Sequence, residues 1–168
     1  AGGLDQWSFG GYLNEVDQVK KAVAFVQNIL GFQVKALVGH SRGANVMMLA
    51  LLDSVLSEVP AVIAVAPRYV MDAGVKSRFS EEQLELMAKG GTVTVMDRFE
   101  VPHIIDQEGI NERLRIGAEE WPKLGSVGRK PHSILLVHGT QDRVIPVEDA
   151  KAFKALLGDK LELEIVSE

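Results

Sequence analysis

The sequence has 168 residues, which suits one domain with a sizeable buried core. Its content of 46% hydrophobic and 24% charged residues is typical of a folded globular protein and excludes a disordered chain. A net charge of −5 with scattered basic residues argues against nucleic-acid binding, and the absence of cysteine excludes disulfides and thiolate metal sites.

The first predicted element is an amphipathic helix over residues 13–30, where apolar residues recur every three or four positions before Gly31. A short apolar strand follows at residues 36–38. The helix predicted over residues 44–56 is apolar on nearly every face, except for one asparagine, and such helices are buried. Its longest apolar run is far shorter than the roughly 20 residues that span a bilayer, so we expect no membrane span.

Continuous apolar runs at residues 61–66 and 133–138 are typical of strands buried on both faces. A helix is predicted over residues 147–157, followed by a more exposed, alternating strand over residues 161–166. This alternation of strands and helices predicts an α/β fold with a mostly parallel sheet flanked by helices.

Residues 68–130 are more charged and less regular than the flanking segments. They contain a predicted helix at residues 80–89 and a β-branched stretch at residues 92–95. We interpret residues 68–130 as a small cap inserted between two strands of a single domain that spans residues 1–168.

The segment Gly39-His40-Ser41-Arg42-Gly43 has the pattern G-x-S-x-G between a strand and a buried helix, which is the context this pattern requires. Such a turn is tight and strained, so we expect side chains at both glycine positions to clash. The turn aims the backbone N–H of Arg42 at a developing oxyanion, and such a donor is worth roughly 2.7 to 4 kcal/mol. Ser41 is therefore a candidate nucleophile. The alternative is that Ser41 only caps the helix, and we expect His40 to be structural.

Asp142 lies in the loop HGTQDRVIP after the predicted strand at residues 133–138. A carboxylate at this end of a parallel strand can orient an imidazole for catalysis. The alternative is that Asp142 is a turn residue, since aspartate is favoured in turns.

The segments VGHSRGANVM and LLVHGTQDRVIPVEDAKAF together resemble the α/β-hydrolase superfamily, especially its cytosolic esterase and serine aminopeptidase-like branch. The likeness begins at Trp7-Ser8-Phe9-Gly10-Gly11-Tyr12 and covers nearly the whole chain, most loosely at residues 68–130. It implies an α/β-hydrolase fold with Ser41 and Asp142 in the triad, Arg42 N–H in the oxyanion hole, and Gly39, His40 and Gly43 in the nucleophile elbow.

The resemblance also implies parts that this sequence lacks. The family's catalytic histidine follows the acid by roughly 25 to 30 residues, which would place it beyond Glu168. The upstream strands would precede Ala1, which would leave the strand at residues 35–38 with a bare edge. We therefore expect an incomplete domain, further polypeptide of the same protein, and no activity from these residues alone.

The histidines present are weak substitutes for that base. His138 leads into the acid loop, and His132 begins the same strand at the wrong end of a parallel sheet. His103 lies in the expected cap, away from a rigid scaffold of the kind that holds a triad base. No HxH or HExxH spacing occurs, so we expect no metal site and no cofactor.

These observations predict a cytoplasmic serine hydrolase, esterase-like (EC 3.1.1), that transfers the acyl group of a small-molecule ester to water through a Ser-His-Asp mechanism. Two alternatives stay open at this point. One is a non-catalytic binding or receptor protein that uses the same pocket. The other is a peptidase or thioesterase of the same fold.

Overall fold

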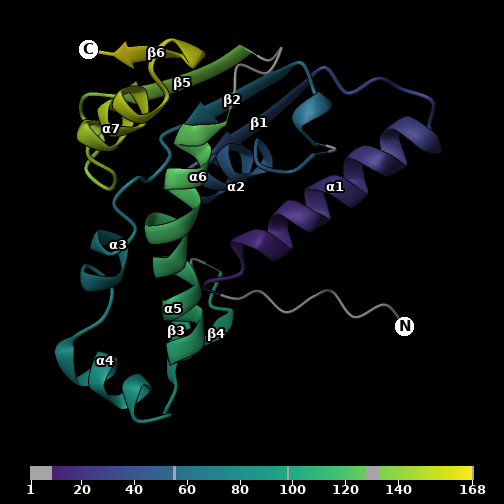
Figure 1. The fold of residues 1–168 in the computed structure, drawn as a ribbon. Helices are drawn as coiled ribbons and strands as arrows, with labels where there is room; N and C mark the ends of the chain where they lie inside the picture. Colours follow the sequence, from purple (N-terminus) through teal and green to yellow (C-terminus); the bar gives the residue numbers. More distant parts are fainter. Residues whose placement is uncertain (1–8, 55, 98, 128–132, 168) are drawn as a thin grey trace. The chain divides into compact units, whose positions relative to one another are not determined.

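The computed structural model describes residues 9–54, 56–97, 99–127 and 133–167. The chain divides into two compact units. Unit 1 comprises residues 9–11 and 70–118, and unit 2 comprises residues 12–69 and 119–167 (Figure 1).

Unit 2 is built on a four-stranded sheet in the order β1-β2-β5-β6, and every neighbouring pair is parallel. The bounds are β1 (Ala36–His40), β2 (Ala61–Val65), β5 (Ser133–Gly139) and β6 (Leu161–Val166). Alternate residues of β2 and β5 are buried, because each of these strands has neighbours on both sides and helices against the sheet. The predicted parallel α/β sheet is confirmed.

Four helices accompany this sheet: α1 (Tyr12–Asn28), α2 (Arg42–Ala50), α6 (Trp121–Ser126) and α7 (Val147–Leu157). All residues of α2 from Ala44 onward are buried, as its apolar sequence predicts. The predicted extension of this helix to residue 56 is wrong. Asp53 Oδ1 instead accepts a hydrogen bond from the Leu56 amide, which starts the short 3-10 helix η1 (Leu56–Glu58).

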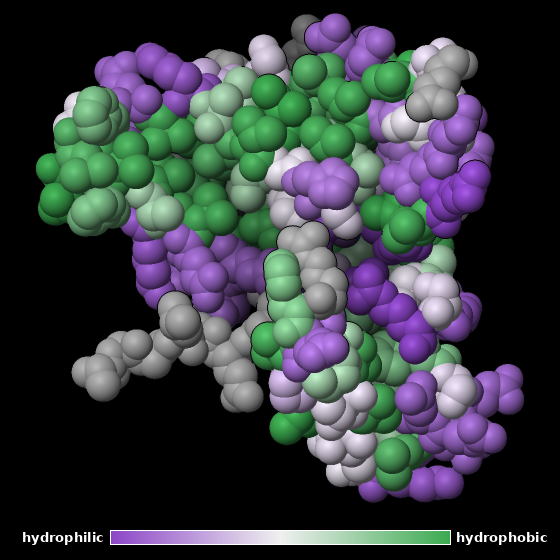
Figure 2. Space-filling view, turned by 180° about the vertical axis from the view of Figure 1, so that it is seen from behind, coloured by the Kyte–Doolittle hydropathy of each residue, from purple (hydrophilic) through white to green (hydrophobic). Residues whose placement is uncertain are grey.

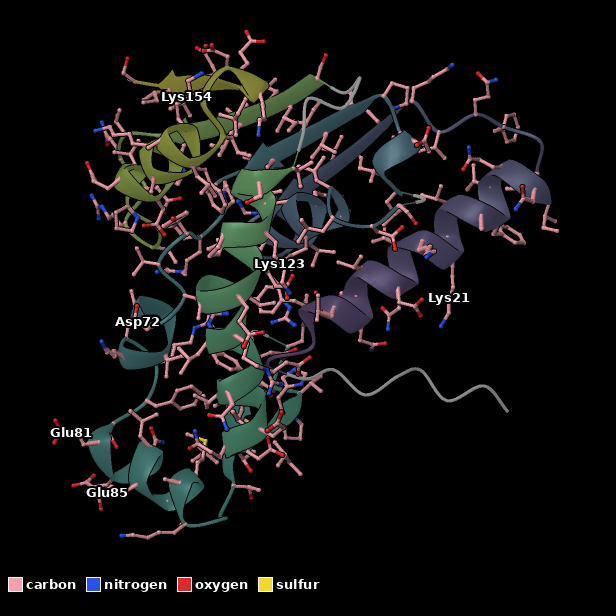
Figure 3. The ribbon with its side chains drawn as sticks, viewed as in Figure 1. Lys21, Asp72, Glu81, Glu85, Lys123 and Lys154 are labelled. Atoms are coloured by element: carbon pink, nitrogen blue, oxygen red, sulfur yellow. The ribbon has the colours of Figure 1, made fainter. Side chains whose placement is uncertain are left out.

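The α7 helix ends at Leu157, and a second 3-10 helix, η3 (Gly158–Lys160), leads into β6. Lys154 Nζ donates to the carbonyl oxygens of Gly158 and Leu161, so one ammonium group stabilises the turn from α7 into β6 (Figure 3). Behind it, the ring of Phe153 contacts those of Tyr69 and Trp121 edge-on, each with a centroid separation of 5.0 Å. These contacts fix α6 and α7 against the core of unit 2.

The β1 strand forms one edge of the sheet, and none of the described strands pairs with its outer side. Val38 on β1 is 64% exposed, and Ile29 and Phe32 in the segment that leads into β1 are 70% and 67% exposed. Figure 2 shows apolar surface gathered around the end of α1 and this segment. Contiguous apolar surface of this kind commonly marks an interaction site.

Unit 1 contains an antiparallel pair, β3 (Val93–Met96) and β4 (Pro102–Ile105), together with three helices. The helices are α3 (Ala73–Lys76), α4 (Glu81–Ala88) and α5 (Gln107–Arg115), and a π-helical turn, η2 (Ile116–Glu120), continues α5. A capping box between Ser80 and Gln83 begins α4. Glu81 and Glu85 project outward from α4 (Figure 3). The core of unit 1 consists of Phe9, Val75, Phe79, Met87, Val93, Ile105 and Ile110.

Among the described residues, no helix combines the length and apolar character that crossing a membrane requires.

Candidate active site

Ser41 sits on a strained turn between β1 and α2. Its backbone has φ 53° and ψ −117°, a conformation that costs a non-glycine residue about 1 to 3 kcal/mol. The Ser41 N–H donates to the carbonyl of Val65 at the end of β2, with an N···O distance of 2.8 Å. Although Ser41 occupies the N-cap position of α2, its side chain makes no capping hydrogen bond. A purely capping role does not explain this strained residue.

The two glycines of the turn differ in their steric environment. A Cβ at Gly39 would lie 2.3 Å from the carbonyl oxygen of Gly43 and 2.7 Å from Met47 Cγ. A Cβ at Gly43 would meet no atom within 4 Å. The expected clash is therefore wrong for Gly43. The crowding comes from strand backbone pressed against helix backbone, and only the Cβ direction of Gly39 points into that gap.

The Arg42 side chain turns toward α1. Its Nε donates to Glu15 Oε1 at 2.8 Å, and its Nη2 lies 2.8 Å from the same oxygen. The guanidinium carbon lies 4.1 Å from the centroid of the Tyr12 ring. The side chain thus ties the first turn of α2 to α1. The backbone N–H of Arg42 belongs to that first turn, where amides point along the helix axis toward the N-terminal end.

Asp142 lies in the loop after β5 and is 25% exposed. Its Oδ1 accepts hydrogen bonds from the amides of Val144 and Ile145 at 2.8 and 2.9 Å. Oδ2 receives no hydrogen bond from any described residue. Partial burial opposes ionisation, but the two amide donors and the imidazoles of His138 and His40 outweigh it, so the pKa of Asp142 is lowered. The carboxylate is held charged with one oxygen available.

His138, near the end of β5, hydrogen-bonds the loop that carries Asp142. Its fully buried side chain donates from Nε2 to the carbonyl of Ile145 at 2.9 Å, and Nε2 lies 3.8 Å from Asp142 Oδ2. The carbonyl oxygen of Ile145 therefore accepts from His138, while the backbone N–H of the same residue donates to Asp142. No described residue hydrogen-bonds His138 Nδ1. This geometry gives His138 a structural role in shaping the acid loop.

The sheet brings Ser41 and Asp142 to the same edge of unit 2. Ser41 follows β1 and Asp142 follows β5, and in a parallel sheet both strands end at the carboxyl edge. Only β2 lies between them, so the two chain positions are separated by about two strand spacings, or roughly 10 Å. The His40 side chain is exposed and close enough to Asp142 to affect its pKa.

A bridge through Arg68 was not foreseen from the sequence. The buried side chain of Asn45 on α2 accepts from the Arg68 amide at 2.7 Å and donates to the Arg68 carbonyl at 2.9 Å. The Arg68 guanidinium in turn donates to the carbonyl of Val144 at 2.6 Å. These contacts connect the helix after Ser41 to the loop of Asp142. The lone asparagine in an apolar helix was the available signal, because buried polar groups need partners.

Two further histidines were considered from the sequence. His103 is on β4 in unit 1, where its Nε2 lies 3.2 Å from Asp97 Oδ2. His132 is outside the described residues. Within the part of the chain that the structure describes, no group of three or more histidine, aspartate or glutamate side chains could hold a metal ion.

No family model matches this sequence, and no curated protein matches it. Solved structures do. The chain is similar to the esterase domain of a Rhodothermus marinus protein, with 19% identity, a TM-score of 0.56, and coverage of 98% of this chain and 60% of that one. It is also similar to an alpha-beta serine hydrolase homologue from Coxiella burnetii, with 20% identity, a TM-score of 0.53, and coverage of 93% and 50%.

A third similar structure is a soluble variant of monoglyceride lipase from Saccharomyces cerevisiae, with 14% identity, a TM-score of 0.65, and coverage of 93% of this chain and 59% of that one. The chain thus spans only half to three fifths of the length of these proteins. At such identities the likeness concerns architecture. The parallel sheet, the flanking helices and these similarities together show that the chain has the α/β-hydrolase fold.

Proposed function

We propose that the full-length protein is a serine hydrolase that acts on carboxylic esters or related acyl compounds. The observation that carries this proposal is the Ser41 turn. Its side chain makes no capping bond, and its strained backbone holds it at the sheet edge that also presents the charged Asp142. A strained residue at a sheet edge is a reason to propose chemistry.

In the proposed reaction, Ser41 Oγ attacks the acyl carbon while a histidine accepts its proton. The carbonyl oxygen becomes an oxyanion that receives a hydrogen bond from the Arg42 N–H. The intermediate collapses, the alcohol leaves with the proton from the histidine, and an acyl-Ser41 ester remains. Water, deprotonated by the same histidine, then hydrolyses this ester to a carboxylic acid and regenerates Ser41.

We place the catalytic histidine in polypeptide that follows β6. The amide of Thr140 donates to the carbonyl of Val166 at 2.9 Å, so the end of β6 lies against the loop that carries Asp142. A residue shortly after Val166 would reach the available Oδ2 of Asp142. His138 is already engaged with Ile145, and we therefore expect residues 1–168 alone to be inactive.

Two further proposals concern the surroundings of the site. Residues 68–130 would act as a cap that shapes substrate choice, and unit 1 contains most of that segment. The open edge of β1 and its exposed apolar neighbours would be covered by further strands of the same protein. The substrate would be a small acyl compound, no cofactor would be needed, and the location would be cytoplasmic.

A fluorophosphonate probe tests the proposal on the full-length protein. We expect covalent labelling of Ser41, with loss of labelling in the S41A variant and unchanged labelling in the S54A variant. Ser54 is a suitable control because it is an exposed serine in the same unit. Absence of labelling in a folded protein would instead favour a non-catalytic binding protein. Parallel assays with an ester, a thioester and an anilide would separate esterase, thioesterase and peptidase activities.

A further inference from the structure

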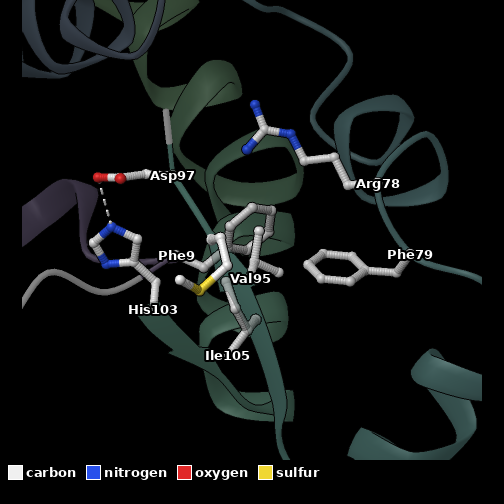
Figure 4. A pocket seen from close by; sticks show the side chains of 8 residues that line it. Phe9, Arg78, Phe79, Val95, Asp97, His103 and Ile105 are labelled. Carbon is white, nitrogen blue, oxygen red and sulfur yellow. Dashed lines mark hydrogen bonds and ion pairs between the residues drawn. The ribbon is translucent and has the colours of Figure 1, made fainter. Parts of the chain in front are cut away.

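Unit 1 contains a pocket of about 640 Å³, a volume in the usual range for small-molecule sites. All of its walls come from unit 1 (Figure 4). The lining residues are Phe9, Arg78, Phe79, Val95, Met96, Asp97, His103 and Ile105.

Most of the pocket wall is apolar. The Phe9 and Phe79 rings meet edge-on with centroids 5.4 Å apart and an interplanar angle of 81°, and both side chains are buried. Two further lining residues, Val95 and Met96 on β3, are 39% and 55% exposed. Exposed apolar side chains that line a pocket favour a ligand with an apolar body. The flexible methionine side chain packs readily against an aromatic ring.

The carboxylate of the pocket, Asp97, is already hydrogen-bonded by its neighbours. Asp97 Oδ1 accepts from the amides of Phe99 and Val101 at 2.8 and 2.9 Å, and Oδ2 lies 3.2 Å from His103 Nε2. A backbone hydrogen bond with Val101 and the side-chain bond to His103 lower the pKa of Asp97 against a smaller opposing effect of burial. Asp97 therefore serves the turn between β3 and β4, and it has little capacity left for a cationic ligand.

The basic side chain of the pocket is Arg78. The Arg78 guanidinium carbon lies 5.8 Å from the centroid of the Phe9 ring, and the side chain is exposed. Within the described ranges, no carboxylate pairs with Arg78. An arginine without a carboxylate partner at the rim of an apolar hollow matches an acidic head group.

We propose that this pocket binds a small molecule with an apolar body, such as an aromatic ring, and a carboxylate head group that pairs with Arg78. The apolar body lies between the phenylalanine walls and the β3 side chains. This site does not depend on the proposed chemistry of Ser41, because every residue that forms it belongs to unit 1.

The test is a binding titration of the protein with 3-phenylpropanoate, and with 3-phenylpropanamide as a neutral ligand of the same shape. Methionine methyl groups labelled with carbon-13 report the location by NMR. We expect the carboxylate to bind about fivefold or more tightly than the amide and to shift the Met96 methyl signal. The signals of Met47 and Met48, which are buried in unit 2, stay unchanged.

Two variants test the role of the guanidinium. Arg78→Gln should abolish the preference for the carboxylate and leave binding of the amide unchanged. Arg115→Gln is the matched control, because it removes a positive charge from an exposed ion pair with Glu108 in the same unit. Equal affinity of the wild-type protein for both ligands would overturn the head-group assignment. Binding that leaves the Met96 signal in place, or no binding by the folded protein, would overturn the site itself.

Discussion

The Ser41 turn and the Asp142 loop lie at the same sheet edge, but different forces hold them. Ser41 is positioned by backbone: a left-handed φ, one amide bond to β2, and the close approach of Gly39 to Gly43. Asp142 is positioned by side chains: its own carboxylate binds two amides, and His138 and Arg68 each hold a carbonyl of the same loop. Backbone geometry therefore positions Ser41, and side-chain hydrogen bonds position Asp142.

The largest expected effect tests the steric half. Gly39→Ala places a methyl group 2.3 Å from the Gly43 carbonyl oxygen, so strand and helix must move apart. We expect the free energy of unfolding to fall by about 3 kcal/mol. Gly43→Ala is the matched control, because its methyl group meets nothing within 4 Å, and its stability should stay within about 1 kcal/mol of wild type. Urea unfolding measures both, and similar losses in the two variants would contradict the asymmetry.

A smaller effect of opposite sign tests the strain at Ser41. Glycine adopts a positive φ without penalty, so Ser41→Gly should raise the free energy of unfolding by about 1 kcal/mol. Ser41→Ala keeps the strained backbone and should bring no such gain. Thermal unfolding of the two variants side by side separates backbone strain from loss of the hydroxyl. A gain of the same size in both variants would place the strain elsewhere.

The smallest effect concerns acid. Because the pKa of Asp142 is lower in the folded chain than the usual value of about 3.9 in an unfolded one, its contribution to stability is complete above that value. That contribution disappears as the pH falls through the folded-state pKa. Between pH 5 and pH 3, the urea midpoint of the wild-type protein should therefore fall further than that of Asp142→Asn. If the urea midpoints of the two proteins fell equally with pH, the charge of Asp142 would not contribute to stability.

The sheet was predictable from the sequence because its evidence is local. The runs AVIAVA and SILLVH are continuous apolar stretches of strand length, and they supply β2 (Ala61–Val65) and β5 (Ser133–Gly139) of the parallel sheet. The end of α2 was missed because apolar content alone continues past Ala50. After Ala50 the amides of Leu51, Leu52 and Asp53 bond to carbonyls three residues back, and the Asp53 side chain then accepts from the Leu56 amide. Hydropathy reveals neither feature.

The candidate site was predictable only in part. Ser41 and Asp142 belong to recognisable sequence patterns, and the parallel sheet brings both residues to one edge. The contact of Arg68 with Val144 joins residues 76 positions apart through a long side chain, and no spacing in the sequence signals it. The asymmetry of the two glycines was likewise hidden, because it depends on the direction in which each absent Cβ would point.

The hydrogen bond from the Ser41 amide to the Val65 carbonyl means that the shape of this bend belongs to two strands at once. A synthetic peptide that copies residues 36–50 would lack the second strand. One of the contacts that hold the Ser41 backbone would then be missing, so we expect Ser41 to relax toward an ordinary conformation and its hydroxyl to react like that of a serine in solution. The Ser41 bend therefore depends on the pairing of β1 with β2 and not on the pentapeptide alone.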